Sequence, residues 1–170
     1  PEEAETVKFG GYVRVEVAGG RTVFIHENFQ KVRAVPYDLP ITGYKNNTVN
    51  YLRLWSAESE TTDFQYHTFS RGEYAKAFEE KINAESVSQV LYPDDSTYEG
   101  KKLRLKQQYF FVSAGLQNII RRYKTENGDI SNLFNHIAVH INDTHPALTV
   151  PEMMRILIDE EGMGWDEAWE

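Results

Sequence analysis

The first third of the chain alternates hydrophobic and polar residues with the period of two that is typical of β-strands. The alternation covers residues 12–17 and 22–25, and a Gly-Gly pair at positions 19 and 20 lies between them. Adjacent glycines accept the positive φ angles of a tight turn, so the pattern predicts an antiparallel β-hairpin. Residues 31–35 predict a third strand, which we expect Pro36 to end because proline donates no ladder hydrogen bond.

The next segments are less regular. Residues 36–47 are rich in proline, aspartate, glycine and asparagine, which predicts a loop. Residues 48–56 alternate again and predict a strand, whereas residues 64–70 show no period and are expected to be irregular. Residues 90–92 predict a short strand before Pro93.

Two segments have helical spacing. Residues 72–88 place hydrophobic side chains on one helix face, and residues 97–124 repeat them in steps of four and three. Ser96 and Glu99 fit a capping box at the start of the second helix. The repeated positions of that helix are Leu105, Tyr109, Val112, Leu116, Ile119 and Tyr123.

A continuous apolar run at residues 137–141 predicts an inner strand of a parallel sheet. A polar loop follows it, and then a helix that we expect Thr149 to cap. The apolar side of this helix contains Met153, Ile156, Leu157 and Met163. Strand, loop and helix form a βα unit, which predicts an α/β fold with ligands bound near the carboxyl end of the strand.

Composition excludes several classes of function. The formal charge of −8 speaks against a broad nucleic-acid surface, and the absence of cysteine excludes disulfides, thiol nucleophiles and cysteine-ligated metals. No apolar run has the length of a membrane helix. We therefore expect a soluble protein of a reducing compartment, the cytoplasm. The chain starts without Met and ends as a helix begins, with Asp166 as its expected cap, which favours a segment of a longer protein.

Three polar clusters are candidates for chemistry. His140, Asp143 and His145 follow the apolar run, with His136 on the same strand face as His140. Imidazole and carboxylate suit zinc or non-haem iron, but Asn142-Asp143-Thr144 also fits a simple Asx turn, and a loop that faces a ligand without metal is favoured.

The other two clusters lie at helix ends. Asp94 and Asp95 precede the long helix, where carboxylates serve acid–base chemistry or simply complement the helix dipole. Arg121 and Arg122 fit either a phosphate site or the electrostatics of a helix C-terminus. Spacing alone favours the electrostatic interpretation for both pairs.

At these residues the chain resembles the α-glucan phosphorylases, from about Phe9 to Trp169. The resemblance is specific because it rests on many motifs in order rather than on one. The motifs are residues 34–38 (AVPYD), 43–47 (GYKNN), 52–57 (LRLWSA), 90–95 (VLYPDD), 99–107 (EGKKLRLKQ), 116–122 (LQNIIRR) and 142–146 (NDTHP).

The resemblance implies phosphorolysis of terminal α-1,4-glucosyl bonds by inorganic phosphate, which releases glucose 1-phosphate with retained configuration. It implies a two-domain glycosyltransferase fold of the GT-B type, in which two Rossmann-like domains face each other across a cleft. The chain would be an internal fragment of the N-terminal domain. Residues 9–47 would form an antiparallel β section and loop, and residues 48–170 an α/β section.

The resemblance also assigns roles to individual residues. Asp143 and His145 would line the glucosyl side of the catalytic cleft. Asp94, Asp95 and Ser96 would belong to the loop that gates the cleft, and Arg121 and Arg122 to a nucleotide-phosphate site of regulated members. The helix from Tyr74 to about Ser88 would pair between the subunits of a homodimer through Tyr74, Phe78 and Ile82.

Pyridoxal 5′-phosphate is the cofactor that the resemblance implies for the full-length protein. None of the nine lysines of this chain lies in the family's cofactor-lysine motif. We therefore expect the chain alone to bind no cofactor and to be inactive. The alternatives are a non-catalytic carbohydrate-binding or dimerisation module, and a metal-dependent hydrolase that uses His140, Asp143 and His145.

Overall fold

The computed structural model describes residues 3–60 and 66–170. Its contacts divide the chain into two compact units. The first unit contains the residues up to Val7 together with Lys31–Gln107, and the second contains Lys8–Gln30 and Gln108–Glu170. The long helix α3 contributes its first part to the first unit and the remainder to the second.

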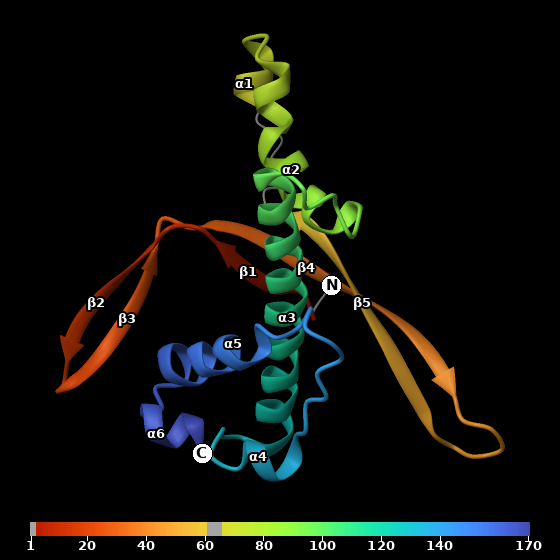
Figure 1. Ribbon diagram of the computed structural model, residues 1–170, viewed down its shortest axis with the longest axis vertical. Coiled ribbons are helices and arrows are strands. Elements are labelled where there is room, and N and C mark those ends of the chain that lie inside the picture. Colours follow the sequence, from red (N-terminus) through yellow and green to blue (C-terminus); the bar gives the residue numbers. More distant parts are fainter. Residues whose placement is uncertain (1–2, 61–65) are drawn as a thin grey trace. The chain divides into compact units, whose positions relative to one another are not determined.

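All of the described strands precede the described helices along the chain, so the fold combines β and α structure (Figure 1). The strands are β1 (Glu5–Phe9), β2 (Tyr12–Ala18), β3 (Arg21–Glu27), β4 (Gln30–Thr42) and β5 (Val49–Ser59). The helices are α1 (Tyr66–Ser70), α2 (Tyr74–Gln89), α3 (Tyr98–Asn127), α4 (Leu133–His136), α5 (Thr149–Arg155), the π-helical turn η1 (Ile156–Glu160) and α6 (Trp165–Trp169). Within the described ranges, no helix has the length and hydrophobicity needed to cross a bilayer.

The predicted hairpin is confirmed. β2 and β3 pair antiparallel from Tyr12 opposite Glu27 to Ala18 opposite Arg21. Gly19 and Gly20 form the turn with φ angles of 57° and 79°. Positive φ at both central positions matches the right-handed twist of the paired strands, which is why glycine is favoured there.

The end predicted for the third strand at Pro36 is wrong. β4 continues to Thr42, and Pro36 and Pro40 both lie within its pairing with β5, opposite Trp55 and Tyr51. A proline fits a strand where its nitrogen points away from the partner, and residues four apart point to the same side. The predicted loop therefore shrinks to residues 43–48, and β1, β4 and β5 form a sheet in that order.

α2 packs against β5 in the first unit. Its buried residues are Ala77, Ala84 and Val87, and the hydroxyl of Ser88 accepts a hydrogen bond from the Ala57 amide at 2.8 Å. Two predictions fail nearby: residues 66–70 form helix α1, and residues 90–92 form bends rather than a strand. Residues 64 and 65 of the segment predicted to be irregular lie outside the described residues.

α3 begins one residue later than predicted and is capped differently. The hydroxyl of Thr97 accepts a hydrogen bond from the Gly100 amide at 3.1 Å, while Ser96 is bound to Asp94, so the proposed Ser96–Glu99 box does not form. In the second unit Val112, Leu116 and Ile120 of α3 pack around Ile156. The helical period predicted this face correctly except at Leu105, whose side chain is exposed.

Residues 137–141 do not form the predicted inner strand. Ile137 has extended angles, φ −123° and ψ 132°, but residues 137–141 pair with none of the described strands. An inner strand needs a partner on each side, and the second unit contributes only the β2–β3 hairpin besides short ends of β1 and β4. Thr149 and Asp166 are also not caps: they lie inside α5 and α6, which start after Leu148 and Gly164.

We predict that Ile156→Ala lowers the free energy of unfolding by about 2–5 kcal/mol, because it leaves a cavity among well-packed neighbours. Ile156 is only 2% exposed. Leu105→Ala is the matched control on an exposed position and should change that free energy by no more than about 0.5 kcal/mol. Urea unfolding measures both, and equal effects of the two substitutions would contradict the packing described.

Candidate functional site

Asp143 and His145 lie in the loop that leads directly into α5. Asp143 has a left-handed backbone, φ 65°, and its carboxylate accepts a hydrogen bond from the Thr144 amide at 2.6 Å. That hydrogen bond, and to a lesser degree the nearby His145 ring, lower the pKa of Asp143. Oδ2 of Asp143 is 3.7 Å from Nε2 of His145, and both side chains are open to solvent. The loop thus presents an ionised carboxylate beside an imidazole, a pair able to accept and donate hydrogen bonds to a hydroxylated ligand.

The metal interpretation of this cluster loses its support. His136 ends helix α4 and its ring packs against Tyr123 with centroids 5.6 Å apart, so it does not share a strand face with His140. His140 instead lines a small cavity of about 220 Å³ whose walls are mostly apolar, among them Phe111, Leu116 and Ile141. In the part of the chain that the structure describes, no three His, Asp or Glu residues are grouped closely enough to hold a metal ion.

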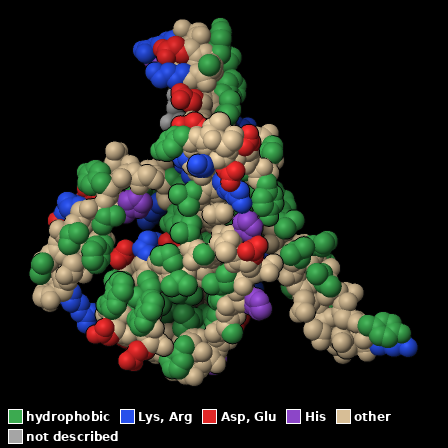
Figure 2. All heavy atoms as spheres, viewed as in Figure 1, with side chains coloured by type: hydrophobic (Ala, Val, Ile, Leu, Met, Phe, Trp, Pro, Cys, Tyr) green, Lys and Arg blue, Asp and Glu red, His purple; other side chains and the backbone are tan. Residues whose placement is uncertain are grey.

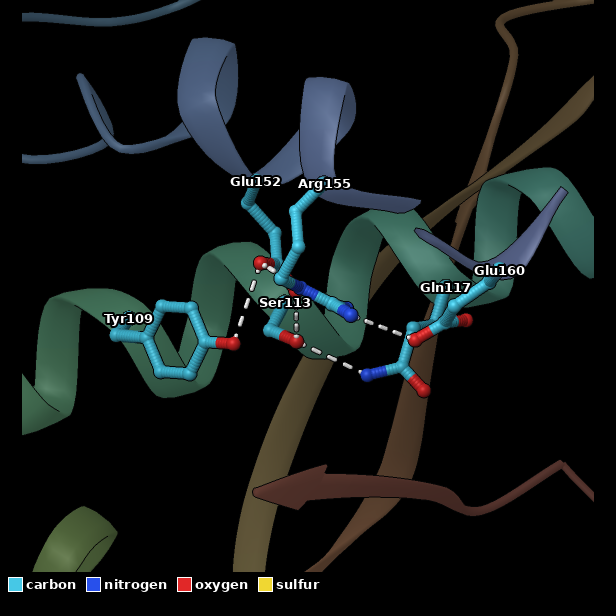
Figure 3. A network of polar contacts seen from close by, with 6 residues as sticks. All are labelled: Tyr109, Ser113, Gln117, Glu152, Arg155 and Glu160. Carbon is cyan, nitrogen blue, oxygen red and sulfur yellow. Dashed lines mark hydrogen bonds and ion pairs between the residues drawn. The ribbon is translucent and has the colours of Figure 1, made fainter. Parts of the chain in front are cut away.

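A buried carboxylate fixes the helix that follows the loop (Figure 3). Glu152 of α5 is 3% exposed and accepts hydrogen bonds from Ser113 Oγ at 2.6 Å and from Tyr109 Oη at 3.2 Å, both on α3. The Ser113 hydroxyl in turn accepts a hydrogen bond from Gln117 Nε2 at 2.9 Å. Because a buried charge is costly without partners, these donors tie α5 to one face of α3.

Arg155 completes this network. Its Nε and Nη2 donate to the two oxygens of Glu152 at 2.7 and 3.0 Å, and its Nη1 donates to Glu160 at 2.8 Å. Burial works to lower the pKa of Arg155, but the bonds to Glu152 and Glu160 outweigh it and raise that pKa above its ordinary value. The pKa of Tyr109 is raised by burial and by the charge of Glu152. The guanidinium is therefore charged throughout the physiological range.

The loop before α3 lies in the first unit, and its residues are brought together there. The Asp94 carboxylate accepts hydrogen bonds from the amide and the hydroxyl of Ser96 at 2.9 and 3.0 Å, and these bonds lower the pKa of Asp94. Asp95 pairs with Arg104, with Nη1 2.5 Å from Oδ2. The sequence pointed to the two carboxylates but not to Arg104. Asp95 and Arg104 are nine residues apart, and the start of α3 lies between them.

Arg121 and Arg122 point in different directions from α3. Arg121 is partly buried and Arg122 is exposed. Consecutive residues of an α-helix are separated by about 100° around its axis, so the two guanidinium groups do not form one fork within this unit. A shared phosphate would have to lie between two separate side chains.

The residues expected to pair between subunits form one exposed face of α2. Tyr74, Phe78 and Ile82 are 57%, 39% and 60% exposed, whereas the opposite side of the helix is buried against β5. Phe69 of α1 covers part of this face, with its ring centroid 4.7 Å from that of Tyr74 and 6.2 Å from that of Phe78. α2 thus has two apolar sides. One is buried against β5 within the same unit, and the side of Tyr74, Phe78 and Ile82 is exposed.

A hollow of about 780 Å³ opens in the second unit, where hydrophobic side chains gather in the lower part of Figure 2. It is lined mainly by apolar residues of the segment after α3 and of α5, η1 and α6, including Leu133, Ile137, Met153, Leu157 and Trp169. The sequence did not predict this hollow, because its lining residues come from segments that are separate along the chain.

Comparison with known proteins identifies the family. A family profile described as "Carbohydrate phosphorylase" matches residues 1–170. The chain belongs to this family. Glycogen phosphorylase of Haemophilus influenzae is 48% identical over the whole chain, and that of Bacillus subtilis is 49% identical over 99% of it. The brain form of human glycogen phosphorylase is 50% identical over 83% of the chain.

This phosphorylase segment spans about a fifth of the length of the curated relatives it matches, 20% of the two bacterial proteins and 18% of the human one. The resemblance stated from the motifs alone is therefore confirmed. The motif residues Arg53 and Asp38 also have a physical role: Arg53 donates to both oxygens of Asp38, at 2.7 and 2.6 Å, across β4 and β5.

We predict that Glu152→Gln lowers the free energy of unfolding by about 1.5–3 kcal/mol, because it removes the charge from a buried hydrogen-bond acceptor and leaves the partly buried guanidinium of Arg155 with Glu160 as its charged partner. The double substitution Glu152→Leu with Arg155→Met removes both charges and should cost clearly less. Urea unfolding of the two variants measures the difference. A double variant as unstable as the single one would show that the ion pair is not the reason for the loss.

Proposed function

We propose that the chain is part of an α-glucan phosphorylase that cleaves terminal α-1,4-glucosyl bonds with inorganic phosphate and releases glucose 1-phosphate. The observation that carries the proposal is the family match over all 170 residues. The loop of Asp143 and His145 supports it, because an ionised carboxylate and an imidazole exposed together before α5 suit the hydroxyls of a glucosyl unit. Asp143 accepts hydrogen bonds from the sugar, and His145 donates or accepts beside it.

The proposal extends to the architecture. The chain is a piece of the N-terminal, Rossmann-like domain of a GT-B glycosyltransferase, with residues 9–47 as its antiparallel section and loop and residues 48–170 as its α/β section. The hydrophobicity of residues 137–141 supports this, since it suits an inner strand, and Ile137 at their start is extended. In the complete domain they pair with strands that this segment does not contain.

The cofactor belongs to another part of the enzyme. A lysine that forms a Schiff base is shifted toward its neutral form by burial, and each of the nine lysines of this chain is at least partly exposed. The residues present therefore do not fit a pyridoxal 5′-phosphate site. We propose that the full-length protein carries this cofactor and that the segment alone has no phosphorylase activity.

Partners and location follow from the same proposal. The full-length enzyme binds α-1,4-glucan and inorganic phosphate, acts in the cytoplasm and forms a homodimer through α2. The loop of Asp94, Asp95 and Ser96 gates the cleft. Arg121 and Arg122 contribute to a nucleotide-phosphate site.

A non-catalytic carbohydrate-binding or dimerisation module is the second candidate, favoured by the exposed apolar face of α2. The two candidates differ in one measurement, the release of glucose 1-phosphate by the full-length protein from glucan and phosphate. A module of the second kind binds glucan or pairs but releases none.

In the full-length protein, Asp143→Asn and His145→Ala should each lower kcat/KM for phosphorolysis about 10²–10³-fold, the usual effect of losing one preorganised polar group in such a site. Asparagine tolerates the left-handed backbone of Asp143, so the fold should be preserved. Initial rates of glucose 1-phosphate release measure the effect. Exposed His67→Ala is the control, and unchanged kinetics in the folded Asp143 and His145 variants would refute the assignment.

Phe78→Asp with Ile82→Asp should weaken dimers of the full-length protein, because burying each of these side chains contributes about 1.5–3 kcal/mol. In a two-fold contact each face meets its own copy, so both changes count twice. Sedimentation over a concentration series measures the dissociation constant. Leu91→Asp, an exposed hydrophobic position outside the helix, is the control, and a dimer that persists undiminished in the double variant rules out α2 as the interface.

A further inference from the structure

One face of α3 holds the loop that precedes it. Gly100, Arg104 and Gln107 are spaced by four and three residues, so they lie in a row along the first turns of the helix. Each of the three faces a different part of residues 90–96. All of these residues belong to the first unit.

Each of the three residues in this row contacts the loop. Gln107 Nε2 donates to the carbonyl oxygen of Val90 at 2.7 Å, and this glutamine is only 4% exposed. Arg104 pairs with Asp95 at 2.5 Å. The carbonyl oxygen of Asp94 comes so close to Gly100 that a Cβ there would lie 1.7 Å from it.

These contacts differ in strength. The Gln107 bond is largely buried and the Gly100 approach is steric, so both hold their parts of the loop in place. The Arg104–Asp95 pair joins partly exposed side chains, 34% and 52%, and is therefore weak and sensitive to salt. The loop is thus anchored at Val90 and held reversibly at Asp95.

We propose that Gly100, Arg104 and Gln107 form the seat of the gating loop, and that Arg104 is a positioning residue whose pairing with Asp95 sets how much of the time the loop is seated. The inference deepens the proposed function, since the gating role of the loop rests on it. Neither the family match nor the motif resemblance assigns a role to Arg104.

The first test measures the loop itself by hydrogen exchange in the full-length protein. Arg104→Met removes the pair, and Gly100→Ala displaces the Asp94 carbonyl without changing any charge. Both should speed the exchange of amides 90–97, Arg104→Met by about two- to fivefold, the range expected for an exposed ion pair. Two matched controls on the same helix should leave it unchanged: exposed Lys101→Met, and Gly115→Ala, where a Cβ would meet nothing within 4 Å.

The second test measures function. If the pair positions the loop, the KM for glucan should depend on ionic strength in the unsubstituted enzyme and in Lys101→Met, and should lose that dependence in Arg104→Met. Arg104→Lys keeps the cation and should retain part of it. Unchanged loop exchange in Arg104→Met, or an unaltered salt dependence of KM, overturns the inference. If the unsubstituted enzyme releases no glucose 1-phosphate, the proposed function is overturned instead. The hydrogen-exchange measurement then still tests whether Gly100, Arg104 and Gln107 hold the loop.

Discussion

The second unit depends on one buried carboxylate. Glu152 lies almost fully out of water between α5 and α3, and each of its oxygens is hydrogen-bonded. An ionised carboxylate in such a place is tolerated only with donors on all sides, and Tyr109, Ser113 and Arg155 supply them. This requirement fixes the rotation of α5 about its own axis more strictly than apolar packing does, because hydrogen bonds are directional. The direction in which the chain enters α5, and with it the loop of Asp143 and His145, follows from this constraint.

Hydrophobic contacts next to the polar network also hold this helical segment against α3. Ile156, one residue after Arg155, turns into the cluster of Val112, Leu116 and Ile120 on the neighbouring turns of α3. The chain changes there from α-helix to the π-helical turn Ile156–Glu160. A wider turn alters which side chains face α3, and here it brings Glu160 within reach of Arg155. Charge pairing and core packing are thus satisfied by consecutive residues of one short helix.

Much of this fold is predictable from periodicity, and the failures have physical causes. The hairpin at Gly19 and Gly20 and the buried face of α3 follow from local rules, because turn chemistry and helical spacing act within a few residues. The ends of elements were harder: Pro36 was expected to stop a strand, but the pairing of β4 with β5 decided that boundary. Residues 137–141 have the composition of an inner strand, yet strand formation needs partners that composition does not provide.

The candidate site residues were likewise predictable only in part. The motif resemblance pointed to Asp143 and His145, whose side chains the structure brings within 3.7 Å of each other. The sequence assigned no role to Glu152 or to Arg104, because it does not show which distant side chain a charge will meet. The role of each became visible only with its partner, at a separation of 39 residues from Ser113 to Glu152 and of nine from Asp95 to Arg104.

The two prolines of β4 have a consequence for solubility. β4 has 13 residues and β1 only five, so most of β4 has no strand beyond it among the described elements. Tyr37, Leu39 and Leu52 leave one face of this ribbon apolar and exposed, a combination that invites pairing with other chains. Pro36 and Pro40 carry no amide hydrogen, and their nitrogens offer nothing to an incoming strand. They protect the open edge of an apolar ribbon against aggregation while leaving its pairing with β5 intact.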